Sequence, residues 1–293
     1  MYDIKALYEA TSVKHAVELL QAHPEAKVLA GGSDVLVQMR EGKLAGKELV
    51  SIYRLDALRG VSLDADGTIR IGSLTSFSHI TQSPIIRQHL NVLGEAVDMV
   101  GGPQVRNIGT IGGNTCNGVT SADSGSTLVA YDAVMQVEGP EGVRLIPIAE
   151  WYVGAGRVSL RPGELQTAIL VPLQKYQGYK GHYIKYAMRN AMDIATTGCS
   201  VNVKLSADKK TIEDVRMAYG VAGPVPMRAP AAEAFAKGKP ALEETIQGFG
   251  EAALGDVNPR NSWRASREFR LHLAQELSKR ALRETIRLSG GVV

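Results

Sequence analysis

The chain has 293 residues, of which 44% are hydrophobic and 22% are charged, and its formal net charge is +3. This length allows one large domain or two smaller ones, and the composition is ordinary for a globular protein. Such a small charge argues against a nucleic-acid or anionic-membrane partner, and no apolar stretch approaches the roughly 20 residues that span a bilayer. The N-terminus lacks a signal-peptide pattern, so we expect a cytoplasmic protein.

The first hundred residues predict a mixture of helices and short strands. Alternation on both sides of an Asp-Ala-Asp-Gly turn predicts a hairpin over 60–74. Pro84, in a first helical turn, predicts the start of one helix over 83–100. The other predicted elements are a helix over 11–23, a strand over 27–32, a short helix over 33–40 and a strand over 48–55.

The second half of the chain predicts strands followed by helices. A second hairpin is predicted over 126–148, turning at 138–142. After a change of composition near Pro172, a three-stranded meander is predicted over 183–220. Helices are then predicted over 229–239, 241–254 and 264–288. This order predicts an α+β fold with two domains, 1–175 and 180–290.

The last predicted helix combines an apolar stripe with basic faces. Apolar residues recur every four positions from Phe269 to Ala281, so we expect this face to pack on the rest of the protein. Between Arg260 and Arg287 there are eight Lys or Arg residues against three Glu. Two explanations stay open: a protein–protein surface, or a solvated face with ion pairs such as Arg264–Glu268 and Arg280–Glu284.

Side chains that would form a catalytic or metal site are not grouped in the sequence. The two cysteines, Cys116 and Cys199, do not form a CxxC pair, and we expect two reduced, partly buried thiols. The six histidines lack the spacing of metal ligands. The motifs of nucleophilic and zinc hydrolases are absent. We therefore predict no catalytic residue and no metal site in this chain.

Two glycine-rich segments carry the functional argument. "KVLAGGSDVLV" (27–37) and "NIGTIGGNTCNGVTSADS" (107–124) place paired glycines among small polar residues. Glycine permits unusual backbone angles and close approach of a ligand, and consecutive N–H groups bind anionic oxygens. Two such segments that face each other would fit the diphosphate of a dinucleotide. Neither matches GxGxxG or a phosphate-binding P-loop, so turns that serve only to reverse the chain remain the alternative.

The same two segments closely resemble the flavin-binding segments of the medium subunit of molybdenum hydroxylases. The resemblance extends over nearly the whole chain, since "RASREFRLHLAQELSKRAL" resembles the family's C-terminal helix. Among subfamilies the chain is most similar to the separate FAD subunit of a bacterial xanthine dehydrogenase. The resemblance implies a two-subdomain FAD-binding domain of the p-cresol methylhydroxylase type, followed by a C-terminal domain of three antiparallel strands and a helix bundle.

The resemblance also implies which residues contact FAD. Where some family members stack an aromatic ring on the flavin, this chain has Val100. "RNAMDIATTG" matches the family segment that borders the isoalloxazine. The implied cofactor-binding residues are Val28, Leu29, Ala30, Gly31, Gly32, Ser33, Asp34, Val35, Thr110, Ile111, Gly112, Gly113, Asn114, Asp123, Gln166, Lys185, Asp193 and Ile194.

The function implied by the resemblance is electron transfer within a larger enzyme. A partner large subunit with a molybdenum cofactor would hydroxylate the substrate, and a small subunit would carry two [2Fe–2S] clusters. This chain would hold FAD and pass the electrons to NAD+, without an iron–sulfur cluster of its own. Two alternatives are a self-contained flavin oxidase or reductase and a nonenzymatic assembly subunit.

Overall fold

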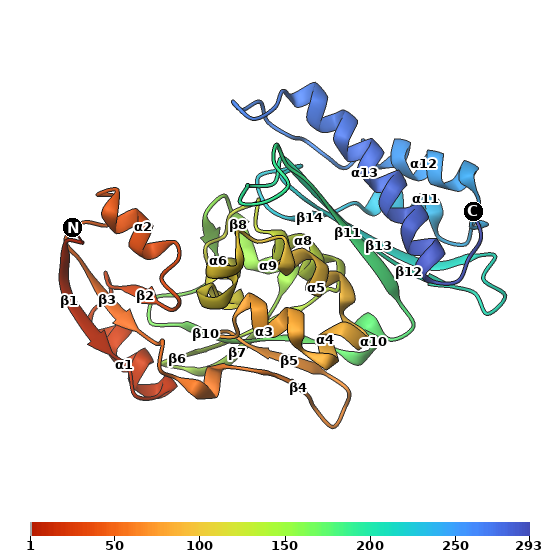
Figure 1. The fold of residues 1–293 in the computed structure, drawn as a ribbon. Coiled ribbons are helices and arrows are strands. Elements are labelled where there is room, and N and C mark those ends of the chain that lie inside the picture. Colours follow the sequence, from red (N-terminus) through yellow and green to blue (C-terminus); the bar gives the residue numbers. More distant parts are fainter. Residues whose placement is uncertain (1) are drawn as a thin grey trace.

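The computed structural model describes residues 2–293 and contains three packed parts along the chain (Figure 1). The N-terminal lobe lies at one end of the molecule, the C-terminal sheet and helices lie at the other, and a large sheet with its covering helices lies between them. Each part has its own cluster of buried apolar side chains.

The N-terminal lobe is a small parallel sheet with two helices. Its strands have the order β1-β3-β2, and both β1 and β2 pair parallel to β3. The predicted first helix forms as α1, with the Ser12 side chain accepting a hydrogen bond from the N–H of His15. The elements are β1 (Ile4–Glu9), α1 (Val13–Ala22), β2 (Lys27–Leu29), α2 (Val35–Arg40), β3 (Lys47–Ser51) and the short 3-10 helix η1 (Asp56–Leu58).

The central part is an antiparallel sheet of order β4-β5-β10-β6-β7. Both predicted hairpins are present, as β4–β5 and β6–β7. The strands are β4 (Val61–Leu63), β5 (Ile69–Gly72), β6 (Val134–Gly139), β7 (Gly142–Pro147) and β10 (Leu165–Val171), and β8 (Tyr152–Gly154) pairs separately with β9 (Arg157–Val158). The helices are α3 (Phe77–Gln82), α4 (Pro84–His89), α5 (Asn91–Asp98), α6 (Pro103–Ile108), α7 (Ile111–Cys116), α8 (Asp123–Ala130), α9 (Ile148–Trp151) and α10 (Leu173–Tyr176).

The C-terminal part is the predicted meander extended by one short strand, with helices packed against the sheet. Its strand order is β11-β12-β13-β14, all antiparallel. The elements are β11 (Lys180–Tyr186), β12 (Thr197–Leu205), β13 (Ile212–Gly220), β14 (Met227–Arg228), α11 (Pro230–Ala236), α12 (Glu243–Ala253) and α13 (Arg267–Leu288). The structure is thus an α+β fold, as the sequence predicts.

Several local predictions were wrong. The single helix predicted over 83–100 is two helices, because the backbone leaves the helical region at Leu90 (φ −129°, ψ 46°). The start of the second predicted hairpin is the end of α8, a helix whose eight residues are all buried. Phe269, expected on the packed face of α13, is 40% exposed, whereas Leu273 and Leu277 are buried.

Candidate functional site

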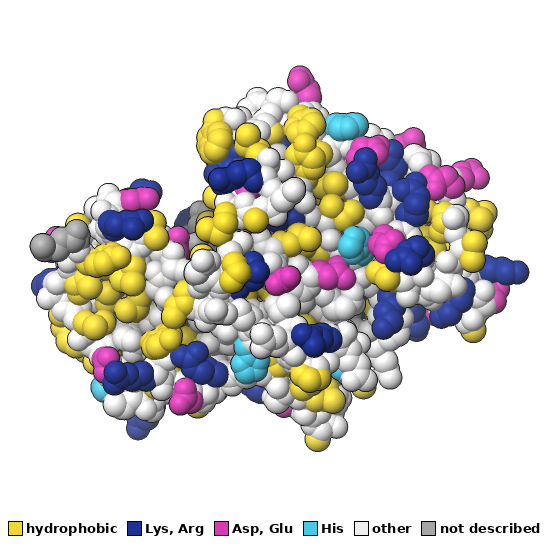
Figure 2. Space-filling view, viewed as in Figure 1, with side chains coloured by type: hydrophobic (Ala, Val, Ile, Leu, Met, Phe, Trp, Pro, Cys, Tyr) yellow, Lys and Arg dark blue, Asp and Glu magenta, His cyan; other side chains and the backbone are white. Residues whose placement is uncertain are grey.

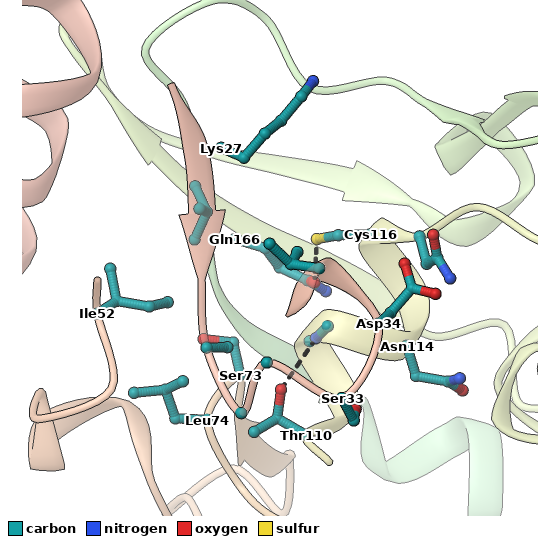
Figure 3. Close-up of a pocket in the computed structure, with 18 of the residues that line it drawn as sticks. Lys27, Ser33, Asp34, Ile52, Ser73, Leu74, Thr110, Asn114, Cys116 and Gln166 are labelled. Atoms are coloured by element: carbon teal, nitrogen blue, oxygen red, sulfur yellow. Dashed lines mark hydrogen bonds between the residues drawn. The ribbon is translucent and has the colours of Figure 1, made fainter. Parts of the chain in front are cut away.

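A cavity of about 470 Å³ lies where the N-terminal lobe meets the central part (Figure 3). Both glycine-rich segments line it, so folding brings together two segments that are about eighty residues apart in sequence. The predicted site residues that line the cavity are Val28, Ala30, Gly31, Gly32, Ser33, Asp34, Val35, Thr110, Gly112, Gly113, Asn114 and Gln166.

The first glycine segment presents open hydrogen-bond donors. Gly32 has φ +72°, a conformation that side chains disfavour, and it turns the chain from β2 toward α2. A Cβ atom on Gly31 would lie 1.8 Å from the carbonyl oxygen of Ile108, so glycine is needed where the two segments touch. Within residues 2–293, the backbone N–H groups from Gly31 to Asp34 have no hydrogen-bond acceptor. Consecutive free N–H groups of this kind bind anionic oxygens.

The second glycine segment differs from its predicted form, because it is helix α7 rather than a turn after a strand. Its N–H groups are already used: Gly112 donates to the carbonyl of Ser73, and Gly113 donates to the Thr110 hydroxyl over 3.1 Å. A Cβ on Gly113 would find only the Thr110 hydroxyl within 4 Å, at 3.0 Å. The second segment therefore lets a ligand approach the backbone closely and offers side chains to it, whereas the first segment offers backbone N–H donors.

Ser73 is a cavity residue outside both glycine-rich segments and was not among the predicted site residues. It follows β5, is 3% exposed, and lines the cavity beside α7. Its hydroxyl is buried without a hydrogen-bond partner within the described chain. An unpaired buried hydroxyl is costly unless a ligand or a water satisfies it. Only the neighbouring small residues in "GSLTS" could have indicated this position, and no motif includes them.

Gln166 and Cys116 form the inner wall of the cavity. The Gln166 side-chain oxygen accepts hydrogen bonds from the Thr115 hydroxyl (2.9 Å) and the Cys116 thiol (3.0 Å; Figure 3). The Gln166 side chain therefore forms its hydrogen bonds with other residues of the chain. Burial raises the pKa of the Cys116 thiol to about 12, so this group stays a protonated donor. Both cysteines are free thiols, as the sequence predicts.

Asp123 and Lys185 lie outside the cavity lining but form a buried ion pair. The Lys185 ammonium is 2.9 Å from one Asp123 oxygen, and the Tyr183 hydroxyl donates to the other over 2.7 Å. Lys185 also donates to the Met99 carbonyl over 3.0 Å, next to the cavity residue Val100. Burial raises the pKa of the Asp123 carboxyl, and the Lys185 charge opposes that rise.

The remaining predicted residues are also outside the cavity lining. Asp193 organises its own loop by accepting hydrogen bonds from the N–H groups of Arg189 and Ile194, while Ile194 is 48% exposed. Leu29 lies in β2, and Ile111 is fully buried. Their contact with a cofactor stays a prediction.

Two further properties concern residues 2–293 as a whole. None of the helices there is both long and apolar enough to cross a membrane. In the same part of the chain, no three His, Cys, Asp or Glu side chains are grouped so that they could hold a metal ion.

Two family models match this chain. Residues 2–174 match the FAD-binding domain in molybdopterin dehydrogenase, and residues 182–285 match the carbon monoxide dehydrogenase flavoprotein C-terminal domain. The first match alone covers more than half of the 293 residues.

Relatives match over nearly their full length. The chain is 42% identical to the xanthine dehydrogenase FAD-binding subunit of Escherichia coli O157:H7, over 99% of each chain. It is 32% identical to the carbon monoxide dehydrogenase medium chain of Hydrogenophaga pseudoflava, over 92% of this chain and 93% of the relative. The fold matches a chain of a solved carbon monoxide dehydrogenase structure from Hydrogenophaga pseudoflava with a TM-score of 0.92, 31% identity and 99% coverage of both chains.

The cavity fits the cofactor that the matched family binds. Its volume is within the range of about 300–1,000 Å³ common for ligand sites. The backbone N–H groups from Gly31 to Asp34, which have no acceptor within residues 2–293, fit the oxygens of a diphosphate. Gly113 leaves room for a cofactor to approach the backbone closely. The Ser73 hydroxyl, which has no partner in the same part of the chain, could form a hydrogen bond with the cofactor. The chain belongs to the molybdenum hydroxylase family, as its FAD-binding subunit.

Proposed function

We propose that this chain transfers electrons within a xanthine- or purine-hydroxylating molybdenum enzyme, from the [2Fe–2S] clusters of a partner chain through FAD to NAD+. The observation that carries the proposal is that both glycine segments line one cavity, with four backbone N–H groups on the first segment that have no acceptor within residues 2–293. The full-length similarity to a relative named as a xanthine dehydrogenase FAD-binding subunit supports the choice of enzyme.

The residues of this chain would bind and orient the cofactor rather than act as acids or bases. Bound FAD supplies the ability to accept electrons singly and release them as a hydride. The N–H groups from Gly31 to Asp34 would donate to the diphosphate, which fixes the cofactor's position along the cavity. Thr110 and Asn114 would add side-chain hydrogen bonds beside Gly113.

We place the reactive end of the cofactor near residues 99–102. Val100 lines the cavity there, and the neighbouring Met99 carbonyl is bonded to Lys185. The proposed role of Asp123 and Lys185 is to hold this segment in position, with Asp193 and Ile194 on the loop beyond it. We also propose the division into domains 1–175 and 180–290, which separates the two matched family models.

The acceptor half of this proposal is tested by rapid mixing of the FAD-loaded chain with NADH or with xanthine. We expect NADH to bleach the flavin absorption and xanthine to leave it unchanged, because this chain would exchange hydride only with nicotinamide. Bleaching by xanthine without a partner chain would favour a self-contained oxidase. Failure of NADH to bleach the flavin would reject NAD+ as the acceptor, and a folded chain that binds no flavin would favour an assembly subunit.

Ser73→Ala should weaken FAD binding by about two- to thirteenfold, because a hydrogen bond contributes roughly 0.5–1.5 kcal/mol. The variant removes a hydroxyl that has no hydrogen-bond partner among residues 2–293, so the cofactor-free chain should be at least as stable as the parent. Titration of the cofactor-free chain with FAD, followed by fluorescence quenching, measures the change.

Ser200→Ala is the matched control for this substitution. Ser200 is also buried, and its hydroxyl likewise lacks a partner in the described part of the chain, but it lies in β12, away from the cavity lining. Its replacement should leave the FAD dissociation constant unchanged. Equal effects of the two substitutions would remove Ser73 from the cofactor site.

A further inference from the structure

Large apolar side chains are exposed around the start of α13 (Figure 2). Trp263 is 78% exposed, Met188 63%, Phe269 40% and Tyr186 39%. The rings of Tyr186 and Phe269 meet edge to face at 5.7 Å. In Figure 2, apolar and basic atoms lie together at the top of the molecule, over the first turn of α13 and the loop that precedes it, and an acidic side chain projects beside them.

The arginines beside these apolar groups have no acidic partner. Among residues 2–293, no carboxylate forms an ion pair with Arg260, Arg264, Arg267 or Arg270. The predicted pair between Arg264 and Glu268 is absent; instead, the Arg264 guanidinium lies 4.2 Å from the Trp263 ring. Arg270 is only 3% exposed, and its Nε is unsatisfied, as is that of Arg264.

Lys279, Arg283 and Arg287, later in the same helix, pair with carboxylates, whereas the exposed Arg280 forms no ion pair within residues 2–293, so the predicted Arg280–Glu284 pair is absent. Lys279 pairs with Glu276, and Arg287 pairs with Glu284 at 2.6 Å. Around the start of α13, four neighbouring arginines thus lack an ion pair within residues 2–293 although Glu268 lies in the first turn, and one of the four, Arg270, is buried. There, burial and the nearby charges of Arg260 and Arg264 lower the pKa of Arg270. Leaving a buried cation unpaired is costly, so an anionic group from outside would stabilise this region.

A series of residue contacts connects this surface to one end of the cavity. The Arg270 guanidinium donates to the Thr196 carbonyl, and the Thr196 N–H donates to the Tyr186 carbonyl over 2.8 Å. On the same loop, Met192 packs on Gly102, where an added Cβ would lie 2.6 Å from its sulfur. Val100, two residues before Gly102, lines the cavity. A protein docked here would therefore lie close to the proposed reactive end of FAD.

We propose that an arginine–aromatic surface around the start of α13 docks the [2Fe–2S] partner chain, which places carboxylates against the arginines. The surface consists of Tyr186, Met188, Trp263, Phe269, Arg260, Arg264, Arg267 and Arg270. The inference rests on the proposed electron-transfer function. Arginine binds carboxylates in a two-pronged geometry, and Trp, Tyr and Arg dominate the energetics of protein interfaces. We choose the electron-donating chain as the partner because electron transfer requires its clusters to lie close to FAD, and this surface lies near the proposed FAD cavity.

The test compares complexes purified through a tag on this chain. Trp263→Ala and Arg264→Glu, combined in one variant, should reduce the iron–sulfur chain recovered per tagged chain by at least about tenfold, since charge reversal repels the acidic groups. FAD per tagged chain should stay at the parent value, because neither residue lines the cavity. Quantitative mass spectrometry, iron content and flavin absorption measure the three quantities.

Leu242→Ala combined with Arg280→Glu is the matched control. Leu242 is 55% exposed, and Arg280 is an exposed residue about three turns further along α13 than Phe269. The control should retain the iron–sulfur chain. Retention by both variants would overturn the docking surface alone, and loss of only the molybdenum chain would overturn the choice of partner. A parent complex without an iron–sulfur chain would overturn the proposed function as well.

Discussion

Gly113→Val is expected to weaken FAD binding by at least about a hundredfold, which corresponds to roughly 3 kcal/mol. The valine methyl groups would occupy the space that the cofactor must approach, because Gly113 lines the cavity and a Cβ there would meet only the Thr110 hydroxyl within 4 Å. Valine has a better helix propensity than glycine, so the cofactor-free chain should change in stability by less than about 1 kcal/mol. Flavin content after purification and urea unfolding of the cofactor-free chain measure both effects.

Gly112→Val separates loss of cofactor from loss of fold. A Cβ at Gly112 would lie 2.6 Å from both the Cβ and the carbonyl oxygen of Ser73, so the backbone would have to move. We expect this variant to unfold at a lower urea concentration than the parent, with a stability loss of about 1–3 kcal/mol. Stability must be compared without FAD, because a bound cofactor stabilises the parent by mass action. A Gly113→Val chain that keeps the parent's flavin content would exclude α7 from the cofactor site.

The sequence predicts the elements whose pattern is local. Alternating residues and turn residues locate the β4–β5 and β6–β7 hairpins, and the Ser12 cap locates the start of α1. The break at Leu90 was not predictable, because the apolar pattern continues across it. It is held by a distant contact, since the Asn91 side chain donates to the Gly181 carbonyl on β11. Tertiary contacts therefore set element boundaries that the local pattern leaves open.

The candidate site was predictable only in part for the same reason. The two glycine segments were recognisable from composition, and the cavity contains both. Composition did not reveal that the N–H groups of α7 are already used, because their partners Thr75 and Ser73 come from the segment after β5. It also did not reveal the pairing of Asp123 with Lys185 or the unpaired arginines beside α13, which depend on the packing of distant elements.

Lys185→Ala should destabilise the chain by about 3–5 kcal/mol, because it leaves the Asp123 charge buried without its partner. Burial alone would then raise the pKa of Asp123 further above its unfolded value of about 3.9. The folded state would hold a proton that the unfolded state has released, so the stability loss should grow as the pH rises above about 4 and shrink on acidification. Urea unfolding of the cofactor-free chain at pH 5 and pH 8 measures this difference.

Lys175→Ala provides the comparison for this buried pair. Lys175 lies 3.0 Å from Asp132, but both side chains are about one-third exposed and Asp132 also pairs with Arg228. Its loss should cost no more than about 1 kcal/mol and show little dependence on pH. Replacing both partners, with Lys185→Met and Asp123→Asn, should recover most of the lost stability, since no buried charge remains. If Lys185→Ala and Lys175→Ala prove equally mild, Asp123 is hydrated in solution and the pair does not hold residues 99–102 in place.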